Sequence, residues 1–122
     1  MMTKYILLLP LEYNDGSAIP QESLEKVFEE LYSLANGYYV AGLGEGAYRM
    51  DDGEKRMEPC LQVWVAIDDS RLGIHTLLLE KVRYFARLLQ QESIYLEECV
   101  SEVLFVWNNG DVCGYQDVGG EA

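Results

Sequence analysis

The sequence predicts a single α+β domain in which two helices cover one face of an antiparallel sheet. Three observations support this fold class. The chain has 122 residues, enough for one two-layer core. Two segments carry apolar residues at helical spacing, and the segments around them carry the apolar runs or alternation of strands. The resulting order is strand, helix, strand, strand, helix, strand, with an extra strand near the C-terminus, which is the ferredoxin-like β-α-β-β-α-β arrangement.

The first strand and the first helix come from an apolar run and a helical periodicity. Residues 5–11 (YILLLPL) predict a strand that is buried on both faces. Its paired part is expected to end near Leu9 or to bulge there, because Pro10 cannot donate to a ladder. Residues 20–37 predict a helix, with Pro20 in its first turn and Asn36-Gly37 at its C-terminal cap. Its apolar face is expected to consist of Leu24, Val27, Phe28, Leu31, Leu34 and Ala35.

A β-hairpin and a second helix follow. Residues 38–50 and 57–67 predict two strands joined by the acidic turn at residues 51–53. Residues 72–89 predict the second helix, whose apolar face is expected to consist of Ile74, Leu78, Val82, Phe85 and Leu89.

Two further strands complete the expected domain. Residues 93–97 predict the last core strand, and residues 102–107 predict an extra strand ahead of a turn at residues 108–111. We expect one domain over residues 1–111 and a loose C-terminal tail over residues 112–122.

The stretch GLGEGAYRMDDG, residues 42–53, raises the question of a phosphate-binding loop. A dinucleotide fingerprint needs G-x-G-x-x-G between a strand and a helix, and a P-loop needs Gly-Lys-Ser/Thr. Here the pattern is G-x-G-x-G, and an acidic turn follows it instead of a helix. The stretch therefore predicts a strand with a glycine stripe, Gly42, Gly44 and Gly46, on one face.

The length of the hairpin loop decides which face carries the glycine stripe. A three-residue loop with Gly53 in the left-handed conformation places Gly44 opposite Cys60, Gly42 opposite Gln62 and Val40 opposite Trp64. Leu43 then packs with Leu61 against the helices, and the glycine stripe lies on the open face beside Trp64. Such a bare stripe is explained by an aromatic ring lying across it, by a neighbouring chain, or by a flat ligand.

Charge and cysteine content limit the classes of partner. The chain has 21 acidic and 9 basic residues and a formal net charge of −12, so we expect no direct binding to nucleic acid or to membranes. A basic protein partner remains compatible with this charge. The three cysteines are widely spaced, which predicts neither a disulfide framework nor a zinc site. Without a convincing signal peptide, a cytoplasmic location is expected.

The order and spacing of several short motifs resemble a family of small bacterial proteins of unknown function with a β-α-β-β-α-β core. The resemblance spans roughly residues 9–96, and this chain carries Tyr48 where the family pattern has tryptophan. Because the family has no known activity, the resemblance implies the fold and no mechanism. The matching motifs are Asp15-Gly16, Gly37-Tyr38-Tyr39-Val40, Gly46-Ala47-Tyr48-Arg49, Asp52-Gly53, Arg56, Glu58-Pro59-Cys60 and Gln91-Glu92-Ser93-Ile94.

Polar and aromatic residues around the hairpin form the candidate site. Arg49 and Glu58 are expected within about a residue of opposite positions, near Arg56, where an exposed salt bridge is the simplest interpretation. The alternative is a pocket on the open face that holds a carboxylate-bearing or planar ligand. The expected ligand or partner surface comprises Tyr48, Arg49, Glu58, Gln62, Trp64, Gln91 and Glu92.

No catalytic group is predicted. His75 is the only histidine and has no adjacent nucleophile, so it is expected at a helix surface. We expect no metal and no cofactor. The leading hypothesis is a small, acidic, non-enzymatic module that forms a homodimer or binds a protein through the open sheet face.

Two other classes stay open. One is an acidic, nucleic-acid-mimicking inhibitor of a basic protein, because the first helix carries several glutamates. The other is a dimeric ferredoxin-like enzyme with Tyr48, Arg49 and Glu58 in an open-face cleft.

Overall fold

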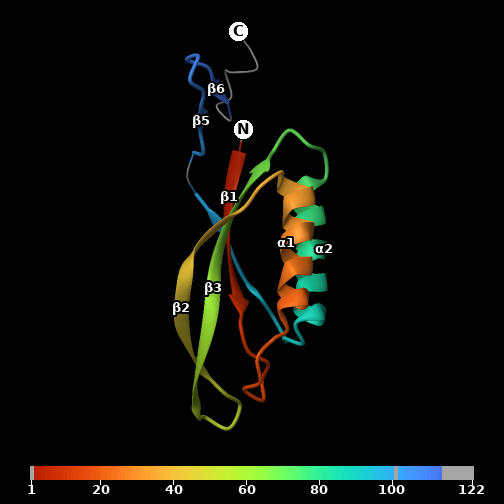
Figure 1. Cartoon of the computed structure of the whole chain (residues 1–122), viewed down its shortest axis with the longest axis vertical. Coiled ribbons are helices and arrows are strands. Elements are labelled where there is room, and N and C mark those ends of the chain that lie inside the picture. The colour runs from red at the N-terminus through yellow and green to blue at the C-terminus, as the bar shows by residue number, and fades with distance from the viewer. Residues whose placement is uncertain (1, 101, 114–122) are drawn as a thin grey trace.

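The main sheet has four antiparallel strands in the order β2-β3-β1-β4, and both helices lie against the same face of it (Figure 1). The computed structural model describes residues 2–100 and 102–113. The predicted ferredoxin-like fold is confirmed. The elements of the main body are β1 (Met2–Pro10), α1 (Gln21–Ala35), β2 (Tyr39–Arg49), β3 (Lys55–Asp68), α2 (Ile74–Leu88) and β4 (Tyr95–Cys99).

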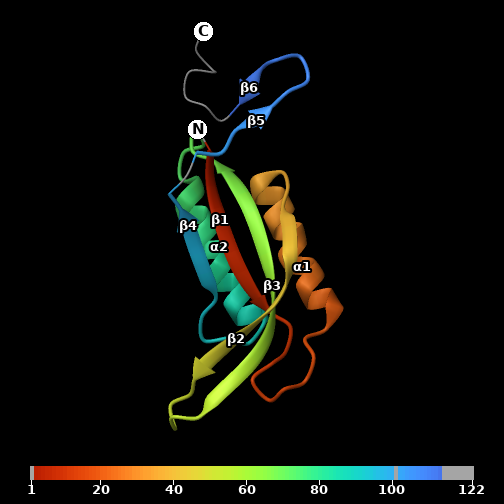
Figure 2. The ribbon, with the colours of Figure 1, turned by 90° about the vertical axis from the view of Figure 1, so that its left-hand side faces the viewer.

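A separate two-stranded hairpin follows the main sheet. Strands β5 (Phe105–Val106) and β6 (Val112–Cys113) pair with each other, and they lie beyond the end of the main sheet where β1 begins (Figure 2). The backbone N–H of Trp107 donates to the carbonyl of Asp111 (2.8 Å) at the turn. The expected extra strand is therefore short and lies outside the main sheet. Residues 114–122 of the expected tail lie outside the described residues, so the division at residue 111 stays a prediction.

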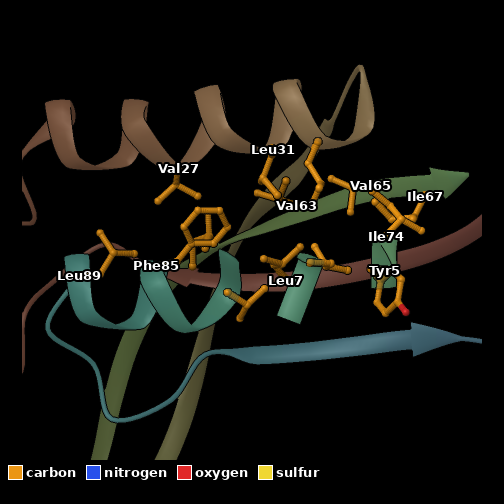
Figure 3. Packing of buried hydrophobic residues seen from close by; sticks show 14 of the residues in the cluster. Tyr5, Leu7, Val27, Leu31, Val63, Val65, Ile67, Ile74, Phe85 and Leu89 are labelled. Carbon is orange, nitrogen blue, oxygen red and sulfur yellow. The ribbon is translucent and has the colours of Figure 1, made fainter. Parts of the chain in front are cut away.

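The core lies between the helices and the inner strands β1 and β3 (Figure 3). Every apolar residue predicted for the second helix is buried. On α1, Val27, Leu31 and Leu34 are buried, while the other predicted apolar residues are partly buried at the edge of the core. Helical periodicity therefore identified the face of each helix that packs on the sheet.

Strand β1 is buried on one face only, and the prediction of a strand buried on both faces is wrong. Tyr5, Leu7 and Leu9 point to the helices and are buried, whereas the residues between them are half-buried on the open face. The reason is that both helices cover the same side of the sheet. The strand ends at Pro10, which still lies in register opposite Cys60, so the pairing extends one residue beyond the predicted end near Leu9 and has no bulge there.

The hairpin between β2 and β3 has the predicted three-residue loop. Arg49 lies opposite Lys55, the N–H of Met50 donates to the carbonyl of Glu54 (2.8 Å), and Gly53 has φ of 87°. The predicted pairings of Gly44 with Cys60 and of Gly42 with Gln62 are confirmed.

One predicted pairing of this hairpin is wrong. A β-bulge between Val40 and Gly42 adds a residue to β2, so Trp64 lies opposite Tyr39 instead of Val40. Leu43 does lie opposite Leu61, but its side chain is 77% exposed. It does not pack against the helices because β2 is the edge strand of the sheet and the helices lie over the inner strands.

Candidate functional site

A cavity of about 330 Å³ lies where the hairpin leaves the body of the sheet. We call it the hairpin cavity. Its lining comes from the end of β1, from the loop after β1, from both strands of the hairpin and from residues 91–95. The strand order brings these segments together, because β1 lies between β3 and β4.

Five of the seven residues predicted for the site line this cavity: Tyr48, Arg49, Glu58, Gln91 and Glu92. Gln62 and Trp64 do not. The Trp64 indole Nε1 donates to Gln62 Oε1 (2.6 Å), and Trp64 lines a different cavity near the start of β2. The structure therefore brings most of the predicted residues together and separates the tryptophan from them.

Arg56 lines the hairpin cavity and joins two segments of the chain. Its Nε lies 3.5 Å from Glu58 Oε2, and the two side chains are 21% and 17% exposed. Its guanidinium also donates to the carbonyl of Tyr13 (2.8 Å) and to that of Asn14. Arg56 therefore attaches the loop after β1 to the hairpin.

The expected salt bridge between Arg49 and Glu58 is wrong. Glu58 lies opposite Gly46, whereas Arg49 lies opposite Lys55 near the hairpin tip. Glu58 pairs with Arg56 instead. Within the described residues Arg49 makes no salt bridge, so its exposed guanidinium is available at the rim of the cavity.

The glycine stripe lies on the open face, and only part of it is covered. A Cβ at Gly46 would come within 2.8 Å of the Tyr48 ring, so this ring lies against Gly46. A Cβ at Gly44 would lie 3.7 Å from the sulfur of Cys60. A Cβ at Gly42 would have no atom of the described residues within 4 Å. Among the three glycines, only Gly46 is explained by an aromatic ring of the same chain, that of Tyr48.

Cys60 lies opposite Gly44 of the glycine stripe, and its thiol is not ionised at neutral pH. Burial raises its pKa, and the nearby Glu58 carboxylate raises it further. Because the thiolate is the nucleophilic form, a raised pKa keeps this cysteine mostly in its less nucleophilic thiol form at neutral pH.

The rim opposite the hairpin tip is positioned by the end of α2. Gln90 has φ of 54°, and the N–H of Gln91 donates to the carbonyl of Ala86 (2.8 Å). The Gln91 side-chain amide donates to the carbonyl of Leu89 (3.1 Å). This turn brings Gln91 and Glu92 to the same cavity as Tyr48 and Arg49.

A hydrogen-bonded group that the sequence analysis missed lies at another place in the fold. The Tyr5 hydroxyl lies 2.7 Å from His75 Nδ1, and His75 Nε2 lies 2.7 Å from Asp69 Oδ1. Thr3 Oγ1 also donates to Asp69 Oδ1 (2.7 Å). His75 is therefore not an isolated surface residue. The available signal was Tyr5 at an inward-facing strand position, since a buried tyrosine hydroxyl needs a partner.

Thr3, Tyr5 and His75 of this group line a cavity of about 370 Å³ between β1, β4 and α2. Burial raises the pKa of Tyr5, and the Glu98 carboxylate, 3.4 Å from the hydroxyl, raises it further. Both ring nitrogens of His75 are occupied, so the histidine has no free nitrogen for a substrate.

The described residues contain no cluster of three or more histidine, cysteine, aspartate or glutamate side chains placed to bind a metal ion. In the same part of the chain, neither helix has the length and hydrophobicity needed to span a lipid bilayer.

Comparison with known proteins shows the fold. No family model matches the chain, and no curated protein matches it in sequence. A phage SAM lyase in complex with S-methyl-5'-thioadenosine is similar in structure, with a TM-score of 0.61 and 13% identity over 80% of each chain. The divalent cation tolerance protein Cut A1 from Thermus thermophilus has a TM-score of 0.59 and 15% identity, covering 84% of this chain and 86% of its own.

A third similar structure is the B. subtilis GlnK-ATP complex, with a TM-score of 0.50 and 15% identity over 91% of each chain. At such low identities a structural likeness extends to the fold and no further. The chain therefore has the ferredoxin-like fold that these proteins share with it.

Proposed function

We propose that this protein is a non-enzymatic binding module that holds a small polar molecule in the hairpin cavity. The observation that carries the proposal is the convergence of Tyr48, Arg49, Glu58, Gln91 and Glu92 on one cavity from three separate segments. Its volume of about 330 Å³ falls within the range of roughly 300–1,000 Å³ typical of ligand sites.

The side chains indicate the chemistry of the ligand. Arg56 and Glu58 neutralise each other and line the cavity, whereas Arg49 is available for a carboxylate or phosphate. The exposed Tyr48 ring offers a surface for a planar group. Two of the similar structures contain adenine compounds, S-methyl-5'-thioadenosine and ATP, so adenine compounds are the first class to test.

Calorimetric titration with S-methyl-5'-thioadenosine and with ATP tests the proposal. We expect binding of at least one of them, and for a phosphate-bearing ligand a loss of about tenfold in Arg49→Ala, because one charge-assisted contact is removed. Arg83→Ala is the matched control, since Arg83 is exposed on α2 away from the cavity. Failure of both compounds to bind at millimolar concentration, or equal effects of the two variants, would contradict the proposal. Chemical turnover of either compound would favour the enzymatic alternative.

We also propose that the protein forms a homodimer through the open face of the sheet. In the part of the chain that the structure describes, no helix covers Ile6 and Leu8 there, and the bare glycines at positions 42 and 44 allow another backbone to approach closely. The measurement is the mass in solution, which is expected to be twice the 13.9 kDa of the chain. Leu8→Lys is expected to shift this mass to that of the monomer, and a monomeric wild type would contradict the dimer.

A second candidate function is binding of a basic protein through α1. Glu22, Glu25 and Glu29 are exposed on this helix, whereas Glu30 is paired with Lys81 (2.7 Å). Three carboxylates without a salt bridge to any described residue present a row of negative charge along one helix to a basic surface. Binding to a basic nucleic-acid enzyme should weaken steeply as salt is raised and should disappear in a variant with these three glutamates replaced by glutamine. Salt-independent binding would contradict this function.

A further inference from the structure

We infer that the cavity around Trp64 is a second binding site and that its ligand is a planar aromatic anion. This aromatic cavity has a volume of about 360 Å³. Tyr38, Tyr39, Trp64 and Phe105 contribute aromatic side chains to it, and Lys4 contributes an ammonium group. It shares no lining residue with the hairpin cavity, so the inference is independent of the ligand proposed for that cavity.

The aromatic walls come from separate elements. The Tyr39 and Trp64 rings lie 5.3 Å apart between centroids on neighbouring strands. The Tyr38 ring stacks on Phe28 of α1 at 4.9 Å, and this contact holds it at the edge of the cavity. Phe105 belongs to the separate hairpin, which lies beyond this end of the sheet (Figure 2). The aromatic walls are therefore held by contacts to different parts of the fold.

Two of the aromatic side chains in this cavity are largely exposed to solvent. Tyr39 is 60% exposed and Phe105 is 43% exposed. A concave group of exposed aromatic residues in a soluble protein is typical of a recognition site, because apolar area left in water has a free-energy cost that a ligand relieves. The shape of the rings favours a flat ligand.

The ammonium group of Lys4 indicates that the ligand of the aromatic cavity is an anion. Lys4 Nζ lies 3.6 Å from the centroid of the Trp64 ring, which holds the ammonium group beside the aromatic walls. Among the described residues that line the cavity, Lys4 is the only charged one, and it makes no salt bridge within that part of the chain. In a chain with a net charge of −12, a lone cation beside aromatic rings selects an anion and rejects a cation.

Three compounds with the same ring test this inference: 2-naphthoate, 2-naphthamide and 2-naphthylmethylammonium. Titrations of the full chain are followed by the NMR signal of the Trp64 indole N–H and by calorimetry. We expect the acid to bind about tenfold more tightly than the neutral amide, and the ammonium compound to bind most weakly.

Two variants identify the groups responsible. Lys4→Met keeps most of the length of the side chain and removes its charge, so it is expected to bring the acid and the amide to within about twofold of each other. Tyr39→Ser removes one exposed ring and is expected to weaken both compounds several-fold. Lys26→Met is the matched control, because Lys26 is exposed on α1 and does not line the cavity. Arg49→Ala, in the hairpin cavity, is expected to change nothing.

Four results would overturn the inference. The first is failure of all three compounds to bind at millimolar concentration. The second is equal affinity for the acid and the amide, and the third is an equal loss of affinity for the acid in Lys4→Met and Lys26→Met. The fourth is a gain of more than about tenfold in affinity for the acid when Asp117 and Glu121 are neutralised in the full chain. Such a gain would mean that these carboxylates compete with the acid for Lys4, so that the occupant of the cavity is the C-terminal segment of this chain.

Discussion

At the scale of single residues, Tyr5 joins the core to a polar group. Its ring is buried between the sheet and α2, and its hydroxyl lies 2.7 Å from His75 Nδ1. On the other side of the imidazole ring, His75 Nε2 lies 2.7 Å from Asp69 Oδ1. The hydroxyl group therefore connects β1 with α2 and with the loop ahead of it.

Tyr5→Phe is expected to lower the free energy of unfolding by about 1–2 kcal/mol, because it leaves a part-buried imidazole nitrogen without its partner. Urea denaturation measures the change. Tyr95→Phe is the control, since the Tyr95 hydroxyl donates to Glu97 at an exposed position. Equal losses in the two variants would show that the contact to His75 contributes nothing specific.

The pKa of Tyr5 predicts how stability depends on alkaline pH. Burial, with the Glu98 carboxylate, raises this pKa above its ordinary value of 10.0. The folded state therefore holds the proton more tightly than the unfolded state. This contribution is fully present below pH 10 and is lost as the pH rises through the raised folded value. The stability of the wild type should fall more steeply above pH 10 than that of Tyr5→Phe, and parallel curves would contradict this assignment.

At the scale of elements, the bulge in β2 determines where the hairpin side chains lie. Gly42 follows the bulge with φ of 154°, a conformation that residues with a Cβ rarely adopt. Gly44 has ordinary strand geometry and room for a methyl group beside Cys60. The backbone conformation therefore requires glycine at position 42 and does not require it at position 44.

Gly42→Ala is expected to destabilise the protein by about 1–2 kcal/mol, because the strain lies in the backbone and no space around the residue relieves it. Gly44→Ala is expected to change stability by less than about 0.5 kcal/mol. Thermal denaturation of both variants tests this difference. If the order of the two losses were reversed, backbone strain at the bulge would not be the reason for Gly42.

Arg56 is the element-scale link between the hairpin and the loop after β1. Arg56→Ala removes the pair with Glu58 and leaves the carbonyls of Tyr13 and Asn14 without their donor, so a loss of about 1–3 kcal/mol is expected. Arg49→Ala, at an exposed position without a salt bridge to any described residue, is expected to cost less than about 0.5 kcal/mol. Urea denaturation separates the two, and a similar loss in both would rule out a structural role for Arg56.

At the scale of the whole molecule, the net charge of −12 opposes the compact state through mutual repulsion. Screening by about 0.5 M sodium chloride should therefore raise the melting temperature relative to about 20 mM. A variant with Glu22, Glu25 and Glu29 changed to lysine should show a smaller salt effect, because its net charge is less negative by six. A melting temperature that does not depend on salt in the wild type would contradict this expectation.

The hairpin cavity and the aromatic cavity are separate in the folded molecule. The hairpin cavity combines charges of both signs, whereas the aromatic cavity has a single cation among its described lining residues. The sequence predicted one pocket that contains both Trp64 and Arg49, but these residues lie at different ends of the hairpin. The sequence could place these residues on one sheet face, but the bulge and the length of the strands determine which of them meet.

Local sequence patterns were sufficient to predict the helices, their buried faces and the three-residue hairpin loop, because periodicity and turn chemistry act between near neighbours. The convergence of five predicted side chains on the hairpin cavity followed from the same pattern and from the order of the strands. Three contacts are visible only in the folded chain: Arg56 with the carbonyls of Tyr13 and Asn14, Tyr39 with Trp64, and Tyr5 with His75. These contacts depend on the strand register, on a one-residue bulge and on how far the helices extend over the sheet, none of which local propensity encodes.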